Sequence, residues 1–363
     1  MADPPSPLGA TAGRLGKLSP AEFDRVIAPH LGATRPEVRV GPRAGTDCAI
    51  VGLGAGRVLA ITTDPLSIVP ALGLEVSAWL ACHLLASDLW TSGIAPTYVS
   101  LGFNLPPGLP DADFEIYCEA MSAEWARLGV AVVGGHTGRY AGCESSIVGA
   151  GTLMGVGDEA RYITPAMAAP GDVVIVTKGC AIEATAIAAR LFPRRLAGVL
   201  DEPGMERARA SIRQVTVVPD CRAALRAGVR ERGVTALHDA TEGGVLGGLL
   251  ELARACGHDL RVEQARIPLS PEARAACEAY GGIDPYWTLS EGTLLATAKP
   301  GRASAVLAAL AKEGIPAAAV GDVVAGGGKL WLRALDGTVR TIDEPEPDPY
   351  WAAYQRAARE GWS

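Results

Sequence analysis

Three aspartates of this chain stand where secondary-structure elements are predicted to end. Asp47 lies in a glycine-flanked turn, Asp64 ends an apolar strand, and Asp88 lies near the end of an amphipathic helix. Backbone amides and carboxylates can converge on a ligand at such ends, and carboxylate oxygens suit Mg²⁺. We therefore predict a magnesium–nucleotide site. The alternative for each aspartate taken alone is a turn residue or a helix cap.

A glycine-rich segment after a predicted buried strand at 130–133 is a second candidate for phosphate binding. Its residues are Gly134, Gly135, His136 and Thr137. Two glycines at the carboxyl end of a strand let the backbone approach a phosphate closely. Because the motif is short, its interpretation depends on the other motifs.

A Thr- and Gly-rich turn joins a predicted strand at 234–238 to a predicted helix at 245–255. Its candidate residues are Asp239, Thr241, Gly243 and Gly244. The first amides of a helix have no partner within the helix and favour an anion. The turn is therefore expected to bind phosphate, and the alternative is an ordinary helix cap made by Asp239 or Thr241.

The composition limits the class of protein. The chain has 363 residues, 48% of them hydrophobic, and a formal net charge of −7. It is long enough for two domains, and it lacks the basic surface that nucleic acid requires. The eight cysteines are scattered, which indicates a reduced, cytoplasmic protein without a zinc or disulfide framework. No signal peptide is expected, and the apolar helix around 76–94 is too interrupted by polar residues to span a membrane.

The elements that must position these residues follow an α/β pattern with a composition shift at 165–172. This shift predicts four segments: a tail with a short helix at 1–34, an N-terminal domain at 35–165, a C-terminal domain at 166–340, and an acidic, aromatic tail at 341–363. His83 falls on the apolar stripe of its helix and is interpreted as a core histidine. Asp88 stays near the same face, where a carboxylate is costly unless it is paired or metal-bound.

The motifs resemble, in their order along the chain, those of the superfamily of aminoimidazole ribonucleotide (AIR) synthetase, the hydrogenase-maturation factor HypE, thiamine-monophosphate kinase and selenophosphate synthetase. The similarity runs from Gly16 to about Val324 and is strongest for the HypE-like, AIR synthase-related branch. It rests on five motifs: Gly-Pro-Arg-Ala-Gly-Thr-Asp-Cys-Ala, Thr-Thr-Asp, Ser-Asp-Leu-Trp-Thr-Ser-Gly, Gly-Gly-His-Thr and His-Asp-Ala-Thr-Glu-Gly-Gly.

This resemblance implies a two-domain α/β fold, AIR-synthase-like, whose N-terminal sheets pair across a homodimer and whose clefts hold ATP and Mg²⁺. It implies metal or phosphate contacts for Asp47, Asp64, Asp88 and Asp239, with catalytic roles for Asp47, Asp88 and His136. Further nucleotide contacts are expected from glycines, threonines and one lysine: Lys17, Gly45, Thr46, Gly134, Gly135, Thr137, Thr241, Gly243 and Gly244.

The implied chemistry is Mg-ATP-dependent phosphorylation of a carbonyl, amide or carbamoyl oxygen of a small molecule, followed by loss of phosphate in a dehydration or cyclisation. HypE acts through a C-terminal cysteine, whereas this chain ends Gly-Trp-Ser, so S-carbamoyl chemistry of that kind is not expected. The alternatives are a small-molecule kinase like thiamine-monophosphate kinase and a non-catalytic nucleotide-binding scaffold whose tail holds a protein partner. Lys178, Glu183 and His238 are lesser candidates for orienting the substrate.

Overall fold

The computed structural model describes residues 16–363, and its N-terminal half is built on a six-stranded sheet. The strand order is β1-β2-β3-β6-β4-β5, antiparallel except for the β4–β5 pair. Along β3 the exposure alternates residue by residue, so one face of the sheet is buried and the other is open. The strands are β1 Val38–Val40, β2 Ala49–Gly54, β3 Arg57–Leu66, β4 Tyr98–Leu105, β5 Ala131–Arg139 and β6 Gly149–Asp158.

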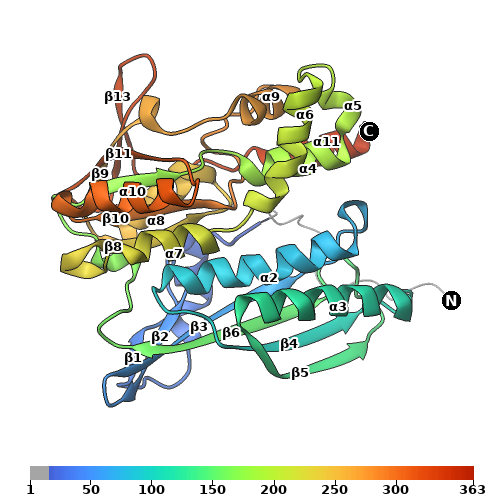
Figure 1. Ribbon diagram of the computed structural model, residues 1–363, viewed down its shortest axis with the longest axis horizontal. Helices are drawn as coiled ribbons and strands as arrows, with labels where there is room; N and C mark the ends of the chain where they lie inside the picture. Colours follow the sequence, from blue (N-terminus) through green and yellow to red (C-terminus); the bar gives the residue numbers. More distant parts are fainter. Residues whose placement is uncertain (1–15) are drawn as a thin grey trace.

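Two long helices cover the buried face of this sheet, as Figure 1 shows. The helices of this half are α1 Pro20–Val26, α2 Leu74–Thr91 and α3 Asp111–Leu128. α3 ends at Gly129, whose left-handed backbone suits a residue without a Cβ. α2 contacts α3 and β3 on one side and α7 and β8 of the second half on the other. α2 is therefore buried along most of its length and carries Asp88 into the junction between the two halves.

The second half contains a seven-stranded sheet in the order β13-β12-β9-β11-β7-β10-β8. Its strands are β7 Val173–Thr177, β8 Val234–Ala240, β9 Asp259–Glu263, β10 Thr293–Ala298, β11 Ala317–Val324, β12 Leu330–Arg333 and β13 Val339–Ile342. Its helices are α4 Ile182–Leu191, α5 Pro193–Leu196, α6 Glu202–Ala210, α7 Val218–Arg226, α8 Gly244–Cys256, α9 Pro271–Ala279 and α10 Ala303–Lys312. β8 is the edge strand nearest to the first half, and every one of its residues is buried.

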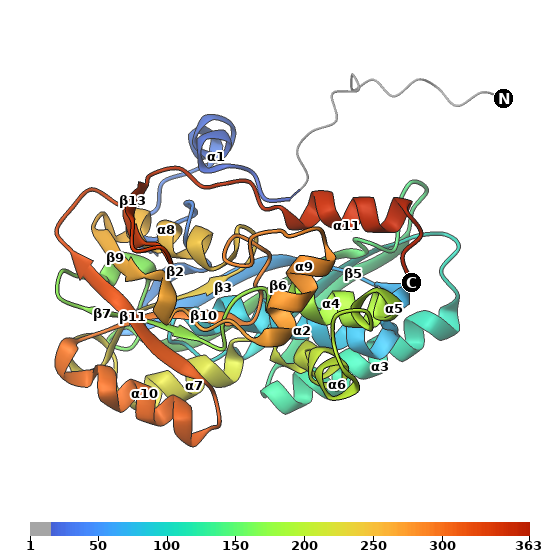
Figure 2. The ribbon, with the colours of Figure 1, turned by 90° about the horizontal axis from the view of Figure 1, so that it is seen from above.

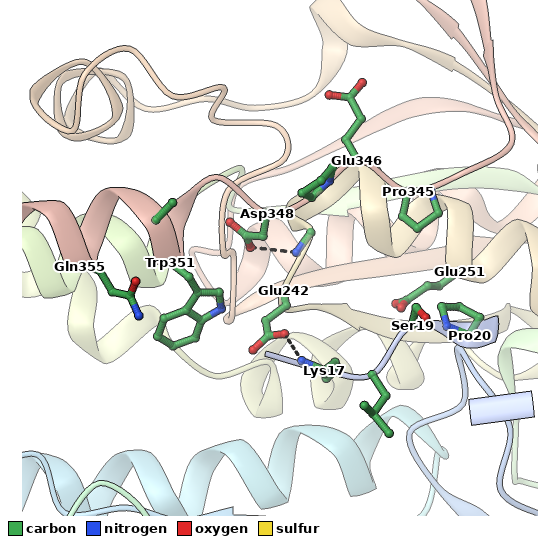
Figure 3. Close-up of a pocket in the computed structure, with 14 residues that line it drawn as sticks. Lys17, Ser19, Pro20, Glu242, Glu251, Pro345, Glu346, Asp348, Trp351 and Gln355 are labelled. Atoms are coloured by element: carbon green, nitrogen blue, oxygen red, sulfur yellow. Dashed lines mark hydrogen bonds between the residues drawn. The ribbon is translucent and has the colours of Figure 1, made fainter. Parts of the chain in front are cut away.

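The acidic and aromatic tail folds back onto the second half, as Figure 2 shows. It forms helix α11 (Tyr350–Arg359), which packs beside α4 and α9. Tyr350, Ala353 and Ala357 recur at helical spacing and form its buried stripe. Figure 3 shows that Trp351 of this helix faces the same pocket as Lys17, near the other end of the described chain.

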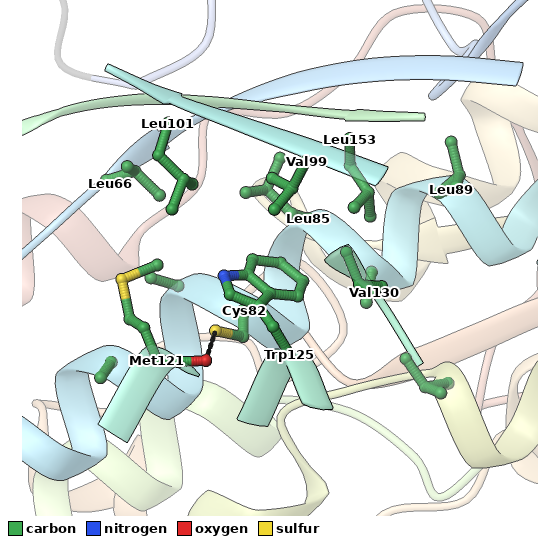
Figure 4. Packing of buried hydrophobic residues seen from close by; sticks show 14 of the residues in the cluster. Leu66, Cys82, Leu85, Leu89, Val99, Leu101, Met121, Trp125, Val130 and Leu153 are labelled. Carbon is green, nitrogen blue, oxygen red and sulfur yellow. Dashed lines mark hydrogen bonds between the residues drawn. The ribbon is translucent and has the colours of Figure 1, made fainter. Parts of the chain in front are cut away.

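The core of the first half lies between its sheet and the pair α2 and α3, as Figure 4 shows. Leu85 and Leu89 of α2 meet Leu153 of β6, and Trp125 of α3 is 2% exposed. Burial of such side chains stabilises the fold by roughly 2 kcal/mol each. This packing fixes α2, and with it Asp88, against the sheet that carries Asp64.

The expected two-domain, AIR-synthase-like α/β architecture is confirmed. The sequence-based prediction of a buried strand at 130–133 is wrong in two respects: β5 continues to Arg139, and residues 131–137 are exposed in the described chain. Strands β9 and β13 and helix α11 were not predicted from the sequence pattern. Among residues 16–363, no helix combines the length and apolarity that a bilayer-spanning segment needs.

Candidate functional site

A histidine flanked by two carboxylates joins the two halves of the molecule. His238 of β8 is buried, and its Nδ1 lies 3.0 Å from the Asp47 carboxylate of the first half. Its Nε2 lies 2.9 Å from Glu251 Oε2 of α8. Burial alone would lower the pKa of His238, but Asp47 and Glu251 raise it well above the usual value. His238 is therefore a protonated bridge that donates from both ring nitrogens and fixes the direction of Asp47.

Asp64 and Asp88 stand side by side next to this bridge. Thr62 Oγ1 donates to Asp88 Oδ2 at 3.0 Å, and the two carboxyl groups share a hydrogen bond. Burial, followed by the charge of Asp64, raises the pKa of Asp88 well above its usual range. Asp47 and Asp239 repel Asp88 as well. Their burial and mutual repulsion therefore favour the protonated form of the pair, whereas a bound cation would favour the ionised form.

Asp239 supplies the fourth carboxylate, from the end of β8. Its side chain is 2% exposed, and its Oδ2 has no hydrogen-bond partner among residues 16–363. Burial and then the charge of Asp47 raise the pKa of Asp239 to about 7. A buried oxygen without a donor, next to further carboxylates, is unfavourable unless a cation binds there. This orphan oxygen and the hard-oxygen donor set fit a divalent cation such as Mg²⁺.

His238 lies close enough to be considered as a further metal ligand. One atom each of Asp47, His238 and Asp239 lie within 4.8 Å of one another. A metal ligand must offer a lone pair, however, and both ring nitrogens of His238 lie within hydrogen-bond distance of carboxylates, which favour the protonated ring. The aspartates are therefore the better ligand set, and His238 is better described as the residue that orients Asp47.

Lys17 brings a positive charge to the carboxylate cluster. Its Nζ lies 2.8 Å from Thr241 Oγ1, and its backbone amide donates to Glu242. Burial alone would lower the pKa of Lys17, but Glu251, followed by Asp239, raises it above the usual value. The neighbouring carboxylates thus favour the charged form of the lysine. It partly offsets the negative charge of the carboxylates and leaves a net negative site.

A pocket of about 580 Å³ opens onto the carboxylate cluster. It is lined by Lys17, Gly45, Thr46, Asp47, Thr62, Asp88, His238 and Glu251, among other residues. Gly45 has φ +70°, and a Cβ there would lie 3.0 Å from the carbonyl oxygen of Glu251, so the turn that carries Asp47 approaches α8 closely. The volume lies within the range of about 300–1,000 Å³ that is typical of ligand pockets.

The turn before α8 is already engaged by a carboxylate of the tail. The amide of Gly243 donates to Asp348 Oδ2 at 2.9 Å, and Asp348 is labelled in Figure 3. Gly244 has φ +64°, and a Cβ there would lie 2.6 Å from the carbonyl oxygen of Tyr286. Gly244 is therefore required by packing, whereas the amide of Gly243 binds an anionic group of the chain itself.

The Gly134–Thr137 segment does not join the carboxylate cluster within one chain. Asp64 of β3 is opposite Gly151 of β6. Gly151 is opposite Leu101 of β4, which is opposite Gly135 of β5. Three strand spacings, about 14 Å along the sheet, therefore separate Gly135 from Asp64. A Cβ at Gly135 would lie 2.0 Å from the carbonyl oxygen of Leu101, so close strand pairing also requires this glycine.

His136 lies one row further along the sheet, where side chains point to the opposite face from Asp64. Its Nε2 lies 2.8 Å from Tyr140 Oη, and the two rings stack. Both residues belong to the open side of the sheet. His136 could therefore reach a carboxylate cluster only in another copy of the chain.

The lesser candidates fall into different environments. Lys178 pairs with Asp220 inside the second half, which is a structural role. Glu183 of α4 lines a second pocket, and His83 is a core histidine held by Thr216 and Glu124, as its place on the helix predicted. Sequence reasoning missed Glu251, although a single acid within the apolar run of α8 was a usable signal.

Two family descriptions match this chain in tandem. The one described as "AIR synthase related protein, N-terminal domain" matches residues 45–156, and the one described as "AIR synthase related protein, C-terminal domain" matches residues 169–332. The chain belongs to the AIR synthase related family. Both matched regions contribute to the carboxylate cluster: Asp47, Asp64 and Asp88 come from the first, and Asp239 comes from the second.

Curated and solved relatives within the AIR synthase related family cover most of the chain. "Carbamoyl dehydratase HypE" of Rhizobium leguminosarum bv. viciae is 30% identical over 78% of this chain and 78% of its own length. The crystal structure of E. coli HypE aligns with a TM-score of 0.68 at 28% identity, over 87% of this chain and 95% of that one. A structure of "Hydrogenase Maturation Protein HypE in complex with ATP" has the same fold, with a TM-score of 0.63 at 22% identity over 91% and 93% of the two chains.

Proposed function

We propose that this protein is an Mg-ATP-dependent enzyme that phosphorylates a carbonyl, amide or carbamoyl oxygen of a small molecule and then releases phosphate. The observation that carries the proposal is the convergence of four aspartates from both halves on one another. Asp47 and Asp88 line the pocket, and Asp239 Oδ2 is buried without a partner among residues 16–363. The kinship to carbamoyl dehydratases supports the same reaction class. The two steps transfer a phosphoryl group to oxygen and then break the carbon–oxygen bond, with phosphate as the leaving group.

Asp47, Asp64, Asp88 and Asp239 would hold the magnesium. When bound, Mg²⁺ neutralises charge on the phosphate groups and so favours phosphoryl transfer. His238 and Thr62 hold Asp47 and Asp88 in place, and Lys17 offers its ammonium group to the phosphates. Cys48 is not a nucleophile in this scheme, because burial raises the pKa of its thiol well above the usual value.

The experiment that tests this function measures the two products of ATP cleavage, ADP and free phosphate, separately. Purified protein is incubated with ATP, Mg²⁺ and a panel of primary amides and formamides, and ADP and free phosphate are measured independently. We expect equal amounts of ADP and phosphate together with a dehydrated or cyclised product. ADP accompanied by a stable phosphorylated product would instead identify a small-molecule kinase. Absence of Mg-ATP binding would contradict both reactions and favour a scaffold.

We further propose that the protein is a cytoplasmic homodimer that pairs through the open face and edge of the first sheet. Val132 and Val133 of the edge strand β5 are 54% and 56% exposed, Tyr98 is exposed on the adjacent strand β4, and Leu53 is exposed on β2 of the same sheet. Apolar side chains gathered on an uncovered sheet face are typical of a protein–protein interface. Such pairing would also allow the Gly134–Thr137 segment of one copy to approach the carboxylate cluster of the other copy.

A charge on β5 is therefore expected to separate the dimer. Val133→Arg places a cation on the proposed interface, whereas Ile116→Arg places one on the exposed side of α3 as a matched control. Light scattering should give a dimer for the parent and Ile116→Arg proteins and a monomer for Val133→Arg. A monomeric parent, or a dimer that survives Val133→Arg, would contradict the proposed interface.

A further inference from the structure

A second pocket lies on the other side of the carboxylate cluster. Along β3, Thr62 and Thr63 line the first pocket, whereas Pro65 lines a separate pocket of about 410 Å³. Asp64 lies between them in the sequence. Along α2, Asp88 lines the first pocket and Leu84, one turn earlier, lines the second. Asp88 therefore lines the first pocket one helical turn from a residue of the second, and Asp64 adjoins a residue of the second in the chain. A phosphoryl group held by these two carboxylates could be approached from the second pocket.

The walls of the second pocket are mostly apolar and come from three parts of the fold. Ile68 and Leu84 belong to the first half, Ile187 to α4, and Trp351 and Tyr354 to α11. Such a lining favours a ligand with an apolar body and offers aromatic ring faces to a cation. No lysine, arginine or histidine lines the pocket among the described residues.

Glu183 is the one carboxylic acid among the described residues that line this pocket. It begins α4, lines the pocket, and has no hydrogen-bond or ion-pair partner within residues 16–363. Burial, then the charges of Glu242 and Asp348, raises its pKa to about 7. Glu291, which interacts with both Asp239 and Glu183, and Tyr350 are the other titratable groups near it. A carboxyl group surrounded by acids and apolar surface gains most from a ligand that brings a positive charge.

We propose that this second pocket binds the phosphate-accepting substrate, and that the substrate is an apolar small molecule with a basic nitrogen held by Glu183. The proposal deepens the proposed function, and it rests on that function for the identification of the ligand as the phosphate acceptor. The apolar body would fill the space between α2, α4 and α11, and the accepting oxygen would face Asp64. Anionic molecules are excluded, because Glu183, Glu291 and the aspartate cluster would all repel them.

Three indoles of similar shape test the charge preference: tryptamine is a cation, tryptophol is neutral and indole-3-acetate is an anion. Binding to the full chain without nucleotide is measured by calorimetry and by saturation-transfer NMR. We expect tryptamine to bind at least about tenfold more tightly than tryptophol, because a charge-assisted hydrogen bond exceeds a neutral one by that margin. Indole-3-acetate should not bind. Equal affinity for tryptamine and tryptophol, or tighter binding of indole-3-acetate, would overturn the proposal.

Two variants place the binding in this pocket. Glu183→Gln keeps the shape of the side chain and should weaken tryptamine binding about tenfold without affecting tryptophol. Ser146→Trp fills the pocket from an exposed position of its rim and should abolish the binding of both. Glu119→Gln, on the exposed side of α3, is the matched control. Tryptamine binding that is unchanged in both pocket variants would place the amine elsewhere and overturn the proposal.

The pH dependence gives an independent readout of Glu183. A carboxyl group with a pKa of about 7 is mostly protonated at pH 6 and mostly ionised at pH 8. The affinity for tryptamine should therefore rise by about tenfold over this interval, and Glu183→Gln should make it flat. An affinity of the parent protein that stays flat or falls over this interval would contradict the role of Glu183.

The same measurements separate this proposal from the proposed function. Mg-ATP binding without amine binding would overturn the acceptor pocket and leave the ATP chemistry intact. Amine binding that depends on Glu183, in a protein that never forms ADP, would leave the amine pocket in place and overturn the phosphoryl-transfer function.

Discussion

Replacing Asp88 by asparagine is expected to reduce Mg-ATP-dependent turnover by on the order of 100-fold or more. The change removes one of the four carboxylates that would share the metal, and it keeps the shape of the side chain. The same change should stabilise the ligand-free protein by about 1 kcal/mol, because it relieves repulsion among buried acids. The two effects have opposite signs, so they distinguish a ligand-binding role from a purely structural one.

The measurement combines turnover with thermal unfolding in the presence and absence of Mg-ATP. The parent protein should gain stability when Mg-ATP is added, and the Asp88→Asn protein should lose most of that gain. Asp336→Asn, in an exposed turn next to Thr338, changes the same group away from the site and serves as the control. A ligand-free Asp88→Asn protein that is clearly destabilised, or one that still responds fully to Mg-ATP, would argue against the metal site.

Replacing Lys178 by methionine is expected to lower the free energy of unfolding by about 3–5 kcal/mol. Lys178 Nζ lies 2.9 Å from Asp220 Oδ2 and 2.7 Å from the carbonyl oxygen of Thr216, and the two charged side chains are 8% and 0% exposed. Asp220 Oδ1 has no other partner among the described residues. Removal of the ammonium group therefore leaves a buried charge without compensation, and α7, which carries Asp220, loses its link to the end of β7.

Urea and thermal unfolding of three variants measure this effect. In the double variant Lys178→Met, Asp220→Leu both charges are gone, so much of the lost stability should return. Arg261→Met breaks an exposed pair with Asp322 and should cost less than about 1 kcal/mol. A loss below about 1 kcal/mol for Lys178→Met would show that water or a neighbouring donor compensates Asp220.

The parts of the site that could be predicted from the sequence are those that a local pattern places at the end of a buried element. Asp47, Asp64, Asp88 and Asp239 are of this kind, and the structure brings their carboxylates together. Glu183 was only a lesser candidate and Glu251 was missed. The roles of both depend on how α4 and α8 meet the first half, which a local pattern does not contain. The spacing of residues within one domain does not predict which of its residues will contact the other domain.

The Gly-Gly-His-Thr segment shows how a local pattern can mislead. Two glycines after an apolar run suggest a strand that ends in a phosphate-binding turn, yet β5 continues through them to Arg139. Gly135 of β5 faces Leu101 so closely that a Cβ would not fit there. The strand therefore needs glycine for close backbone approach, which is also why a phosphate-binding loop needs it. The buried helix α11 could have been predicted instead, because Tyr350, Ala353 and Ala357 have helical spacing.

The position of α11 has a consequence for how such a protein can acquire new substrates. The groups proposed to bind magnesium and ATP belong to the two sheets, to α2 and to the segments before α1 and β2, whereas one wall of the proposed acceptor pocket belongs to the helix after the last strand. Exchange of this single segment would reshape what the pocket admits and leave the carboxylate cluster as it is. If the same wall also keeps bulk water from the accepting oxygen, an exchanged segment would change the choice of substrate and the protection against hydrolysis at the same time.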